Sequence, residues 1–466
     1  MQQPNVLFIM SDEHDPGVTG CYGDPIVETP NLDRLAGEGI TFDGCYTTSP
    51  LCVPARLSFT AGKYVSHCNA WNNDCRLDPA DLATLPRILQ EAGYETYLCG
   101  KQHYDRTRRY GFTDILPEIH SNRRNKHNRL SRRRPGDTKE NRASWEGRTD
   151  AFHPGDESTI LNHDRKVTRR TCEFLENWHD GLPPFFLFVG HLSPHFPLIA
   201  PQEIYEKYKG RVPMPEIPEG LLESLPHNYQ QLRYGFGQTN QDPETVQKGR
   251  DLYWALTDWY DGQIGRILDT LDRSGLAENT IVIYTSDHGE NKGDHGLWWK
   301  NNVYEHAARI PLIARWPGRW AAGQRRAGAC SLVDVVQTVA EIGGADAPHD
   351  WDGDSMLAWM DDAKTDWKDE ALSEYYGHNI ASGIVMLRRG PWKYVYHSRA
   401  GEEYGPEREL YNLDDDPKEF NNLAHDPAQA DRIEELHAAM LAELGEHPDE
   451  TEQRARRENG DGYAEA

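Results

Sequence analysis

Four short apolar runs, each followed directly by ionisable side chains, constrain the fold of this chain more than any other feature. They are Asn5–Met10, Tyr94–Cys99, Pro184–Val189 and Thr280–Thr285. Runs of this length that are apolar throughout are typical of strands buried on both faces, as in a parallel sheet. The sequence therefore predicts a large, mostly parallel sheet.

Amphipathic patterns between these runs predict the helices that cover the sheet. Apolar residues at 82, 85, 88 and 89 share one helical face ahead of Gly93, and a longer stripe runs from Leu252 to Leu271 ahead of Gly275. Strands that alternate with helices indicate an α/β fold. Ligands of such sheets bind at the carboxyl ends of the strands.

The pattern changes at about residue 370. The runs Ile384–Leu387, Trp392–His397 and Glu409–Leu413 predict a short antiparallel meander, and a helical pattern follows around Pro427–Leu444. We therefore expect a main domain over residues 1–370, an α+β subdomain over residues 371–447 and a tail over residues 448–466. The tail is charged and poor in apolar residues, so we expect it to be loose or to contact a partner subunit.

A basic insertion interrupts the main domain at about residues 105–150. Its centre, Ser121–Pro135, contains no acidic residue and carries Arg123, Arg124, Lys126, Arg129, Arg132, Arg133 and Arg134. A solvated insertion or a contact with an acidic surface of another subunit is the favoured interpretation. Steering of an anionic substrate is the alternative.

The overall charge excludes several classes of partner. The 466 residues include 50 basic and 75 acidic side chains, a net charge of −25, which disfavours nucleic acid and anionic membranes as partners.

No apolar run approaches the roughly 18 residues of a membrane span. The first residues lack a basic region ahead of their apolar stretch, so we expect a cytoplasmic protein. Eight cysteines without a CxxC pair indicate neither a disulfide framework nor a zinc site.

Chemically active residues follow each of the four predicted strands. Because the carboxyl ends of parallel strands share one edge of a sheet, we expect these residues to meet: Asp12, Glu13, Lys101, His103, His195, Asp287, His288 and Lys300. Carboxylates with one imidazole suit a divalent cation that prefers oxygen, such as Ca²⁺, Mg²⁺ or Mn²⁺. The lysines beside them suit an anionic ester.

A further segment contains Cys52, Pro54 and Arg56 in the spacing C-x-P-x-R and continues to Gly62. It resembles the signature of the type I sulfatases, in which the cysteine is oxidised to formylglycine. The blocks TPNLDRLAGEGITFD, GKQH, SPHFP, TSDHGENKGDHGLWWK, ARIPLIARWPG and ELYNLDDDPKEFNNLA resemble family blocks in family order. The resemblance covers the chain apart from the basic insertion and the tail, and it points to the branch of choline sulfatases and phosphonate monoester hydrolases. It implies an alkaline-phosphatase-like α/β/α sandwich.

The resemblance also implies roles for individual residues. Cys52 would be the formylglycine nucleophile, held by Arg56. Asp12, Glu13, Asp287 and His288 would bind one divalent metal together with the modified Cys52; Lys101, His103, His195 and Lys300 would surround the sulfate; and Asn73 would touch the same group. Glu13 departs from the family pattern, which has Asp or Gln there. His191 and His295 are expected to have packing roles.

The implied reaction is hydrolysis of a sulfate monoester. One hydroxyl of the hydrated aldehyde attacks sulfur, and the other is then deprotonated so that the aldehyde reforms and sulfate leaves. His195 and Lys300 are assigned to the departing oxygen as proton donor and charge stabiliser, and His103 is the base. Calcium is the first choice of metal, with manganese or magnesium as alternatives. A formylglycine-generating enzyme is the implied maturation partner, and a homodimer or homotetramer is the expected assembly.

Two other functions stay open at this point. A phosphonate monoester or phosphodiester hydrolase of the same superfamily would share the fold, metal and nucleophile, but the resemblance implies that it would replace Lys101 and His103 with neutral hydroxyl residues. A non-catalytic anion-binding relative would be expected to have lost one of Cys52, Arg56, Asp287 or Lys300. The sequence shows no additional Asp and His ligands for a second metal, and it does not identify the alcohol part of the substrate.

Overall fold

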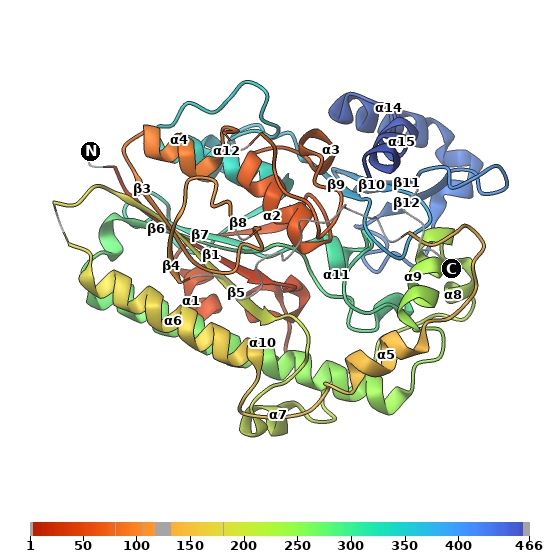
Figure 1. The fold of residues 1–466 in the computed structure, drawn as a ribbon, viewed down its shortest axis with the longest axis horizontal. Helices are drawn as coiled ribbons and strands as arrows, with labels where there is room; N and C mark the ends of the chain where they lie inside the picture. The colour runs from red at the N-terminus through yellow and green to blue at the C-terminus, as the bar shows by residue number, and fades with distance from the viewer. Residues whose placement is uncertain (1–2, 80, 106, 117–131, 180, 460–466) are drawn as a thin grey trace.

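The computed structural model describes residues 3–79, 81–105, 107–116, 132–179 and 181–459, which form two β-sheets with helices around them (Figure 1). The strands are β1 (Asn5–Asp12), β2 (Ile40–Tyr46), β3 (Glu95–Gly100), β4 (Thr113–Leu116), β5 (Phe185–Pro194), β6 (Thr280–Ser286), β7 (Leu312–Arg315), β8 (Gln324–Ser331), β9 (Glu370–Tyr375), β10 (Ile384–Arg389), β11 (Trp392–His397) and β12 (Glu407–Asn412). The helices are α1 (Pro30–Gly37), α2 (Cys52–Ala61), α3 (Val65–Cys68), α4 (Leu85–Glu91), α5 (Arg142–Thr149), α6 (Thr159–Asn177), α7 (Gln202–Tyr208), α8 (Leu221–Ser224), α9 (His227–Phe236), α10 (Pro243–Arg273), α11 (Glu305–Ala308), α12 (Leu332–Gly343), α13 (Leu357–Asp361), α14 (Ala430–Leu444) and α15 (Pro448–Asn459).

The four apolar runs form the centre of the large sheet, as predicted. Its strand order is β4-β3-β5-β1-β6-β7-β2-β8, so that β3, β5, β1 and β6 are neighbours. These four strands are parallel, with Phe8 of β1 opposite Phe188 of β5 and Ile283 of β6. Strand β7 is antiparallel to both of its neighbours. The α/β class with a mostly parallel sheet is therefore confirmed.

Alternate residues of β1 face two different helical layers, which makes the main unit a three-layer sandwich (Figure 1). Val6 and Phe8 pack in one core with α2, α4 and α12. Leu7 and Ile9 pack in the other with α1, α6 and α10. Because every β1 side chain is buried, the middle of the strand does not alternate apolar with polar residues, and Val6–Met10 are all apolar.

Two glycines bring the ends of β3 and β5 close together at the edge where the ionisable residues gather. A Cβ at Gly190 would lie 1.8 Å from the carbonyl oxygen of Lys101, and Gly100 has a φ of +94°. Both positions therefore require glycine, one for the close approach and the other for the backbone conformation. This geometry places Lys101 at the carboxyl edge of the sheet.

The C-terminal part contains the expected antiparallel meander. Strands β12, β11, β10 and β9 form a second sheet in that order, and α14 follows where a helix was predicted. The boundaries between main domain, subdomain and tail stay a prediction. Within the described ranges, no helix combines the length and the apolar character needed to cross a membrane.

The expectation of a loose tail is wrong for residues 448–459, which form helix α15. Glu452 of this helix is buried and accepts hydrogen bonds from both terminal nitrogens of Arg132, at 2.9 and 3.1 Å. Glu458 accepts a hydrogen bond from Trp71 at 2.7 Å. Glu452 and Glu458 are thus partnered within the same chain. Residues 121–131 of the basic stretch lie outside the described residues, but Arg132 is buried, unlike a residue of a solvated insertion.

Because the pair of Arg132 and Glu452 is buried, Glu452→Gln should lower the free energy of unfolding by about 3 kcal/mol, since an uncompensated guanidinium would remain inside. Denaturant unfolding followed by circular dichroism measures this change. Glu450→Gln, at an exposed position of the same helix, is the control and should change stability by less than about 0.5 kcal/mol. Equal stability of the two variants would show that the ion pair does not anchor α15.

Candidate active site

Helix α2 carries the cysteine of the C-x-P-x-R segment at its first residue. All ten residues of α2 are buried. Gly62 ends the helix with a φ of +64°, and a Cβ there would lie 2.3 Å from the ring of Trp351. At the other end the Val53 amide donates to Oδ1 of Asn73 at 3.1 Å. Both ends of α2 are therefore fixed, which sets the position of Cys52.

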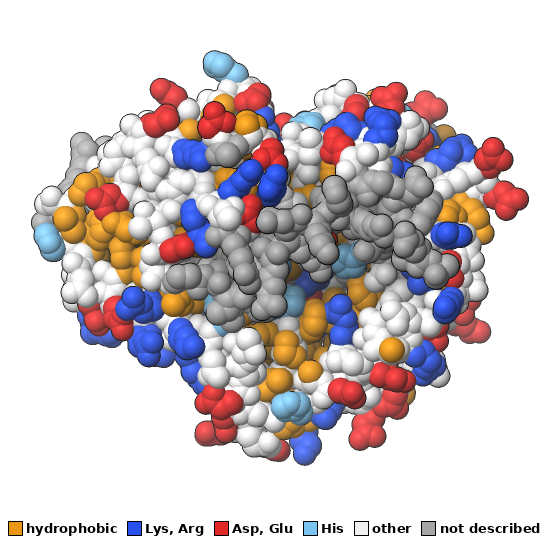
Figure 2. All heavy atoms as spheres, viewed as in Figure 1, with side chains coloured by type: hydrophobic (Ala, Val, Ile, Leu, Met, Phe, Trp, Pro, Cys, Tyr) orange, Lys and Arg blue, Asp and Glu red, His pale blue; other side chains and the backbone are white. Residues whose placement is uncertain are grey.

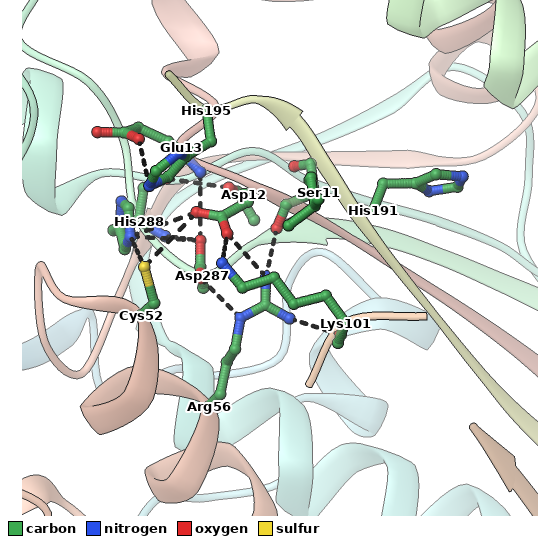
Figure 3. A network of polar contacts seen from close by, with 12 residues as sticks. Ser11, Asp12, Glu13, Cys52, Arg56, Lys101, His191, His195, Asp287 and His288 are labelled. Carbon is green, nitrogen blue, oxygen red and sulfur yellow. Dashed lines mark hydrogen bonds and ion pairs between the residues drawn. The ribbon is translucent and has the colours of Figure 1, made fainter. Parts of the chain in front are cut away.

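Cys52 lies in a buried cluster of possible metal ligands formed by the carboxyl ends of β1 and β6 (Figure 3). Ligand atoms of Asp12, Cys52, Asp287 and His288 all lie within 4.8 Å of one another. The Cys52 sulfur is 3.2 Å from Nε2 of His288 and 3.7 Å from Oδ1 of Asp12. The structure thus brings together four of the five residues predicted to bind the metal.

Arg56 lies one helical turn from Cys52 and holds the backbone and carboxylates of this cluster in place (Figure 3). Its Nε donates to Asp287 at 2.7 Å, and its terminal nitrogens donate to the carbonyls of Ser11 and Lys101 at 3.1 and 3.0 Å. Lys101 in turn contacts Asp12. Arg56 is wholly buried, so its charge depends on these acceptors.

The electrostatics of the cluster favour ionised carboxylates and a neutral imidazole. Burial lowers the pKa of His288 to about 3, despite the opposing effect of Asp287. Burial would raise the pKa of Asp287, but the charge of Arg56 prevails and lowers it below its ordinary value. Near neutral pH, His288 is therefore a neutral nitrogen donor and Asp287 an anionic oxygen donor.

Glu13 lies apart from the four-residue cluster. Its Oε2 is 3.0 Å from Nζ of Lys300 and 3.1 Å from Nε2 of His195. The φ of Glu13 is +66°, a left-handed backbone conformation. Burial raises the pKa of Glu13 well above its ordinary value, although Lys300 opposes this shift. Its carboxyl oxygens group instead with Asp12 and His195.

The ring of His195 is oriented by its own neighbour. Its Nδ1 donates to the carbonyl of Phe196, so Nε2 is free of a proton and accepts a hydrogen bond from Lys300 at 2.8 Å. Burial lowers the pKa of His195 well below its ordinary value, with Lys300 as the next cause. Burial would also lower the pKa of Lys300, but Cys52 and Glu13 outweigh it and raise that pKa. Lys300 is thus the cation of this pair.

Cys52, His195 and Lys300 line a cavity of about 460 Å³. Figure 2 shows one face of the molecule, with hydrophobic, basic and histidine side chains gathered near its centre. The predicted residues that line the cavity are Cys52, Asn73, Lys101, His103, His195 and Lys300. Eleven other residues line it without a role predicted from the sequence, among them Arg148, Phe196, Phe236, Trp299 and His378. Phe196 and Trp299 are neighbours of predicted residues in the chain, but no motif marks the other three.

His191 and His295 both pack away from the cluster. His191 lies within 3.3 Å of the Thr168 hydroxyl and 3.4 Å of the Tyr260 hydroxyl, and in Figure 3 it points away from Cys52. The ring of His295 stacks on Tyr304 with 3.9 Å between centroids. These contacts agree with the packing roles expected for both residues.

Comparisons with known proteins place this site in a family. The model of the sulfatase family matches residues 4–345, and that of the C-terminal region of N-sulphoglucosamine sulphohydrolase matches residues 293–446. The chain is 29% identical over 446 residues to the choline-sulfatase of Rhizobium meliloti (strain 1021), covering 91% of this chain and 83% of that protein.

Solved structures share the fold. The phosphonate monoester hydrolase of Agrobacterium radiobacter superposes with a TM-score of 0.76 at 21% identity, covering 95% of each chain. A protein in complex with its substrate D-glucosamine-2-N,6-O-disulfate superposes with a TM-score of 0.72 at 23% identity, covering 100% of each chain. Because the family model spans most of the sequence and the alkaline-phosphatase-like fold agrees with it, the chain belongs to the sulfatase family and is an enzyme that hydrolyses sulfate esters.

Proposed function

We propose that the enzyme cleaves sulfate monoesters with a nucleophile derived from Cys52 by oxidation to formylglycine. The observation that carries the proposal is the position of Cys52 in the lining of the cavity, with Lys101 and Lys300 lining the same space. Two lysines suit the oxygens of an anionic ester, and the buried surroundings strengthen their effect.

The thiol itself is poorly suited to the attack. Burial raises the pKa of Cys52 to about 12, against the lowering effect of Lys300. A thiol with this pKa is almost entirely protonated near neutral pH, and the thiolate is the reactive form. A hydrated aldehyde at this position would supply a hydroxyl nucleophile and a second hydroxyl through which sulfate can be released. We therefore assign the oxidation of Cys52 to a formylglycine-generating enzyme acting with molecular oxygen.

The buried cluster fits one divalent metal ion. Asp12 and Asp287 offer anionic oxygens and His288 a neutral nitrogen, all within 4.8 Å of one another and of Cys52. Oxygen-rich sets of this kind suit calcium first, while the imidazole leaves manganese and magnesium as alternatives. When bound, such an ion would stabilise negative charge on the ester and on the nucleophile. Glu13 would join this set only with a change of its present side-chain position.

The protein's own residues have separable tasks in this proposal. Arg56 holds Asp287 and the backbone of Ser11 and Lys101. Lys300, which donates to Nε2 of His195, is placed to give a proton to the departing alcohol oxygen. Because Nε2 of His195 carries no proton, we propose that His195 orients Lys300 and does not itself donate a proton.

The remaining two assignments concern the sulfate itself. Lys101 and His103 follow the end of β3 and line the cavity beside Cys52. We assign Lys101 to the sulfate oxygens and His103 to the removal of the proton that precedes release of sulfate. The Asn73 side chain also lines the cavity while its oxygen caps α2, so it combines a binding role with a structural one.

A phosphonate monoester or phosphodiester hydrolase is the second candidate, because the solved phosphonate monoester hydrolase shares the fold over 95% of each chain. Lys101 and His103 favour the sulfate ester. The choline-sulfatase relative and the neighbour that binds a disulfated glucosamine support the same choice. A cytoplasmic location and assembly as a homodimer or homotetramer stay predictions.

A panel of substrates with one chromogenic leaving group tests this choice. The 4-nitrophenyl group is presented as sulfate, phosphate, phosphodiester and phenylphosphonate, with rates normalised to the formylglycine content found by mass spectrometry. We expect the highest kcat/KM for the sulfate, and we expect Lys101→Ala to lower that value by about 100-fold while affecting the phosphonate less. A clear preference for the phosphonate or the diester would overturn the sulfatase assignment and leave the fold and nucleophile intact.

A further inference from the structure

Arg148 enters the active-site cavity from helix α5 and is enclosed by aromatic rings. Its guanidinium carbon lies 4.5 Å from the ring centroids of Phe196 and Trp299 and 5.2 Å from that of Phe236. Guanidinium groups are attracted to the faces of such rings. These contacts restrict the side chain and hold a positive charge at the wall of the cavity.

This charge has no anionic partner of its own. Among the residues that the structure describes, no carboxylate lies within ion-pair distance of the Arg148 guanidinium, and the described lining of the cavity contains no Asp or Glu. Burial lowers the pKa of Arg148, and only the more distant charges of Glu13 and Glu290 oppose this. Aromatic contacts do not use the N–H donors of a guanidinium, which form paired hydrogen bonds with carboxylates and other planar anions.

Arg148 lies close to the proposed site of reaction. Lys300 contacts the same Phe196 ring, with Nζ 5.6 Å from its centroid. The two cations therefore lie within about 10 Å of each other, a distance that one small molecule can span and over which charges interact at 0.1 M salt. Lys101 and Lys300 each contact a carboxylate, on Asp12 and Glu13 respectively, whereas Arg148 does not.

We propose that Arg148 binds a second anionic group on the alcohol part of the substrate, so that the preferred substrates are sulfate esters of acidic alcohols. This inference rests on the proposed function and adds the substrate class. An aromatic enclosure of this kind could otherwise receive a quaternary ammonium group. Here the chain's own cation fills it, so a cationic alcohol would meet repulsion from Arg148. The site thus selects against cationic esters and in favour of anionic ones.

The test compares esters that differ only in a remote charge. The probes are 3-(sulfooxy)benzoate, its neutral methyl ester and 3-(trimethylammonio)phenyl sulfate, with released sulfate measured by ion chromatography. We expect the wild-type enzyme to prefer the benzoate. Arg148→Met should lower the ratio of kcat/KM for the benzoate over that for the methyl ester by about 10- to 100-fold, the effect of losing a hydrogen bond between charged groups. A second set of assays uses benzene-1,3-diyl disulfate in place of the benzoate. Comparison of the two substrates shows whether Arg148 prefers a carboxylate or a second sulfate as the remote anionic group.

Two further variants complete the design. Arg142→Met removes an exposed arginine from the same helix and should leave the ratio at its wild-type value. Arg148→Lys keeps a cation and should restore part of the preference if Arg148→Met folds poorly. An unchanged ratio in a folded Arg148→Met enzyme would overturn the proposal.

Binding separates this inference from the proposed reaction. In the Cys52→Ala protein, calorimetry should show tighter binding of 3-(sulfooxy)benzoate than of its methyl ester, and Arg148→Met should abolish the difference. Equal binding of the two esters would contradict the role of Arg148 whatever the reaction is. If none of the esters is cleaved but this difference is found, the proposed function fails and the anion site stands.

Discussion

Cys52→Ala should lower kcat/KM for an aryl sulfate by at least about 10⁴-fold, because an alanine side chain cannot be converted to the aldehyde whose hydrate supplies the nucleophile. Wild-type protein produced without a formylglycine-generating enzyme should show a loss of similar size. Its thiol has a pKa raised by burial to about 12 and is therefore protonated. Mass spectrometry of the peptide that contains residue 52 should show the aldehyde only in the active preparation.

The control is Cys172→Ala, which removes a partly exposed free thiol from α6 and should leave activity within about twofold. Activity should follow the fraction of aldehyde across preparations of intermediate maturation. A fully active preparation in which residue 52 is wholly cysteine would overturn the proposed mechanism, although the family assignment would remain.

Asp287→Asn should reduce metal content and activity together. The substitution removes one of the two aspartate charges in the cluster, and the loss of transition-state stabilisation should lower kcat/KM by about 10³-fold. It also leaves the buried Arg56 without its 2.7 Å carboxylate partner, so the free energy of unfolding should fall by about 3 kcal/mol. Elemental analysis of folded protein gives the metal content, and denaturant unfolding gives the stability.

The control for this variant is Asp261→Asn. Asp261 is also buried, but it accepts hydrogen bonds from the first turn of α1 and is not one of the clustered ligands. This control should lose stability while it retains the metal. A metal content of one per chain in folded Asp287→Asn protein, or full turnover after chelation, would contradict the proposed metal site.

The centre of the fold and several residues of the site could be predicted from the sequence. Strands buried on both faces must be apolar, and parallel strands must end at one edge, so Asp12 and Asp287 had to lie near each other. The C-x-P-x-R segment identified Cys52 and Arg56 as site residues through its resemblance to a family signature. The strand predictions depend on periodicity and topology, and the signature on a short motif, so short segments were sufficient for both.

Other features depend on contacts between distant segments and could not be predicted in this way. The turn of Glu13 toward Lys300 follows from its backbone conformation, which no local pattern marks. Arg148 comes from a helix without a motif, and its neighbours come from three other segments. Helix α15 was expected to be a loose tail because no neighbouring residue in the sequence indicates that Glu452 pairs with Arg132, 320 residues away.

The complete burial of α2 has a consequence for how an active molecule is made. A maturation enzyme must reach the Cys52 side chain, yet in the folded protein all ten residues of this helix are buried. On the proposed mechanism, modification of Cys52 therefore competes with folding. The time available for modification is the time that the ribosome takes to synthesise the rest of the chain. Helix α15, whose Arg454 holds the carbonyl of Ser66 just beyond α2, emerges about 400 residues after Cys52. At roughly 5–20 residues per second this gives the nascent chain on the order of 20–80 s. Substitutions that slow closure of the sheet should therefore raise the modified fraction, even as they reduce the amount of folded protein.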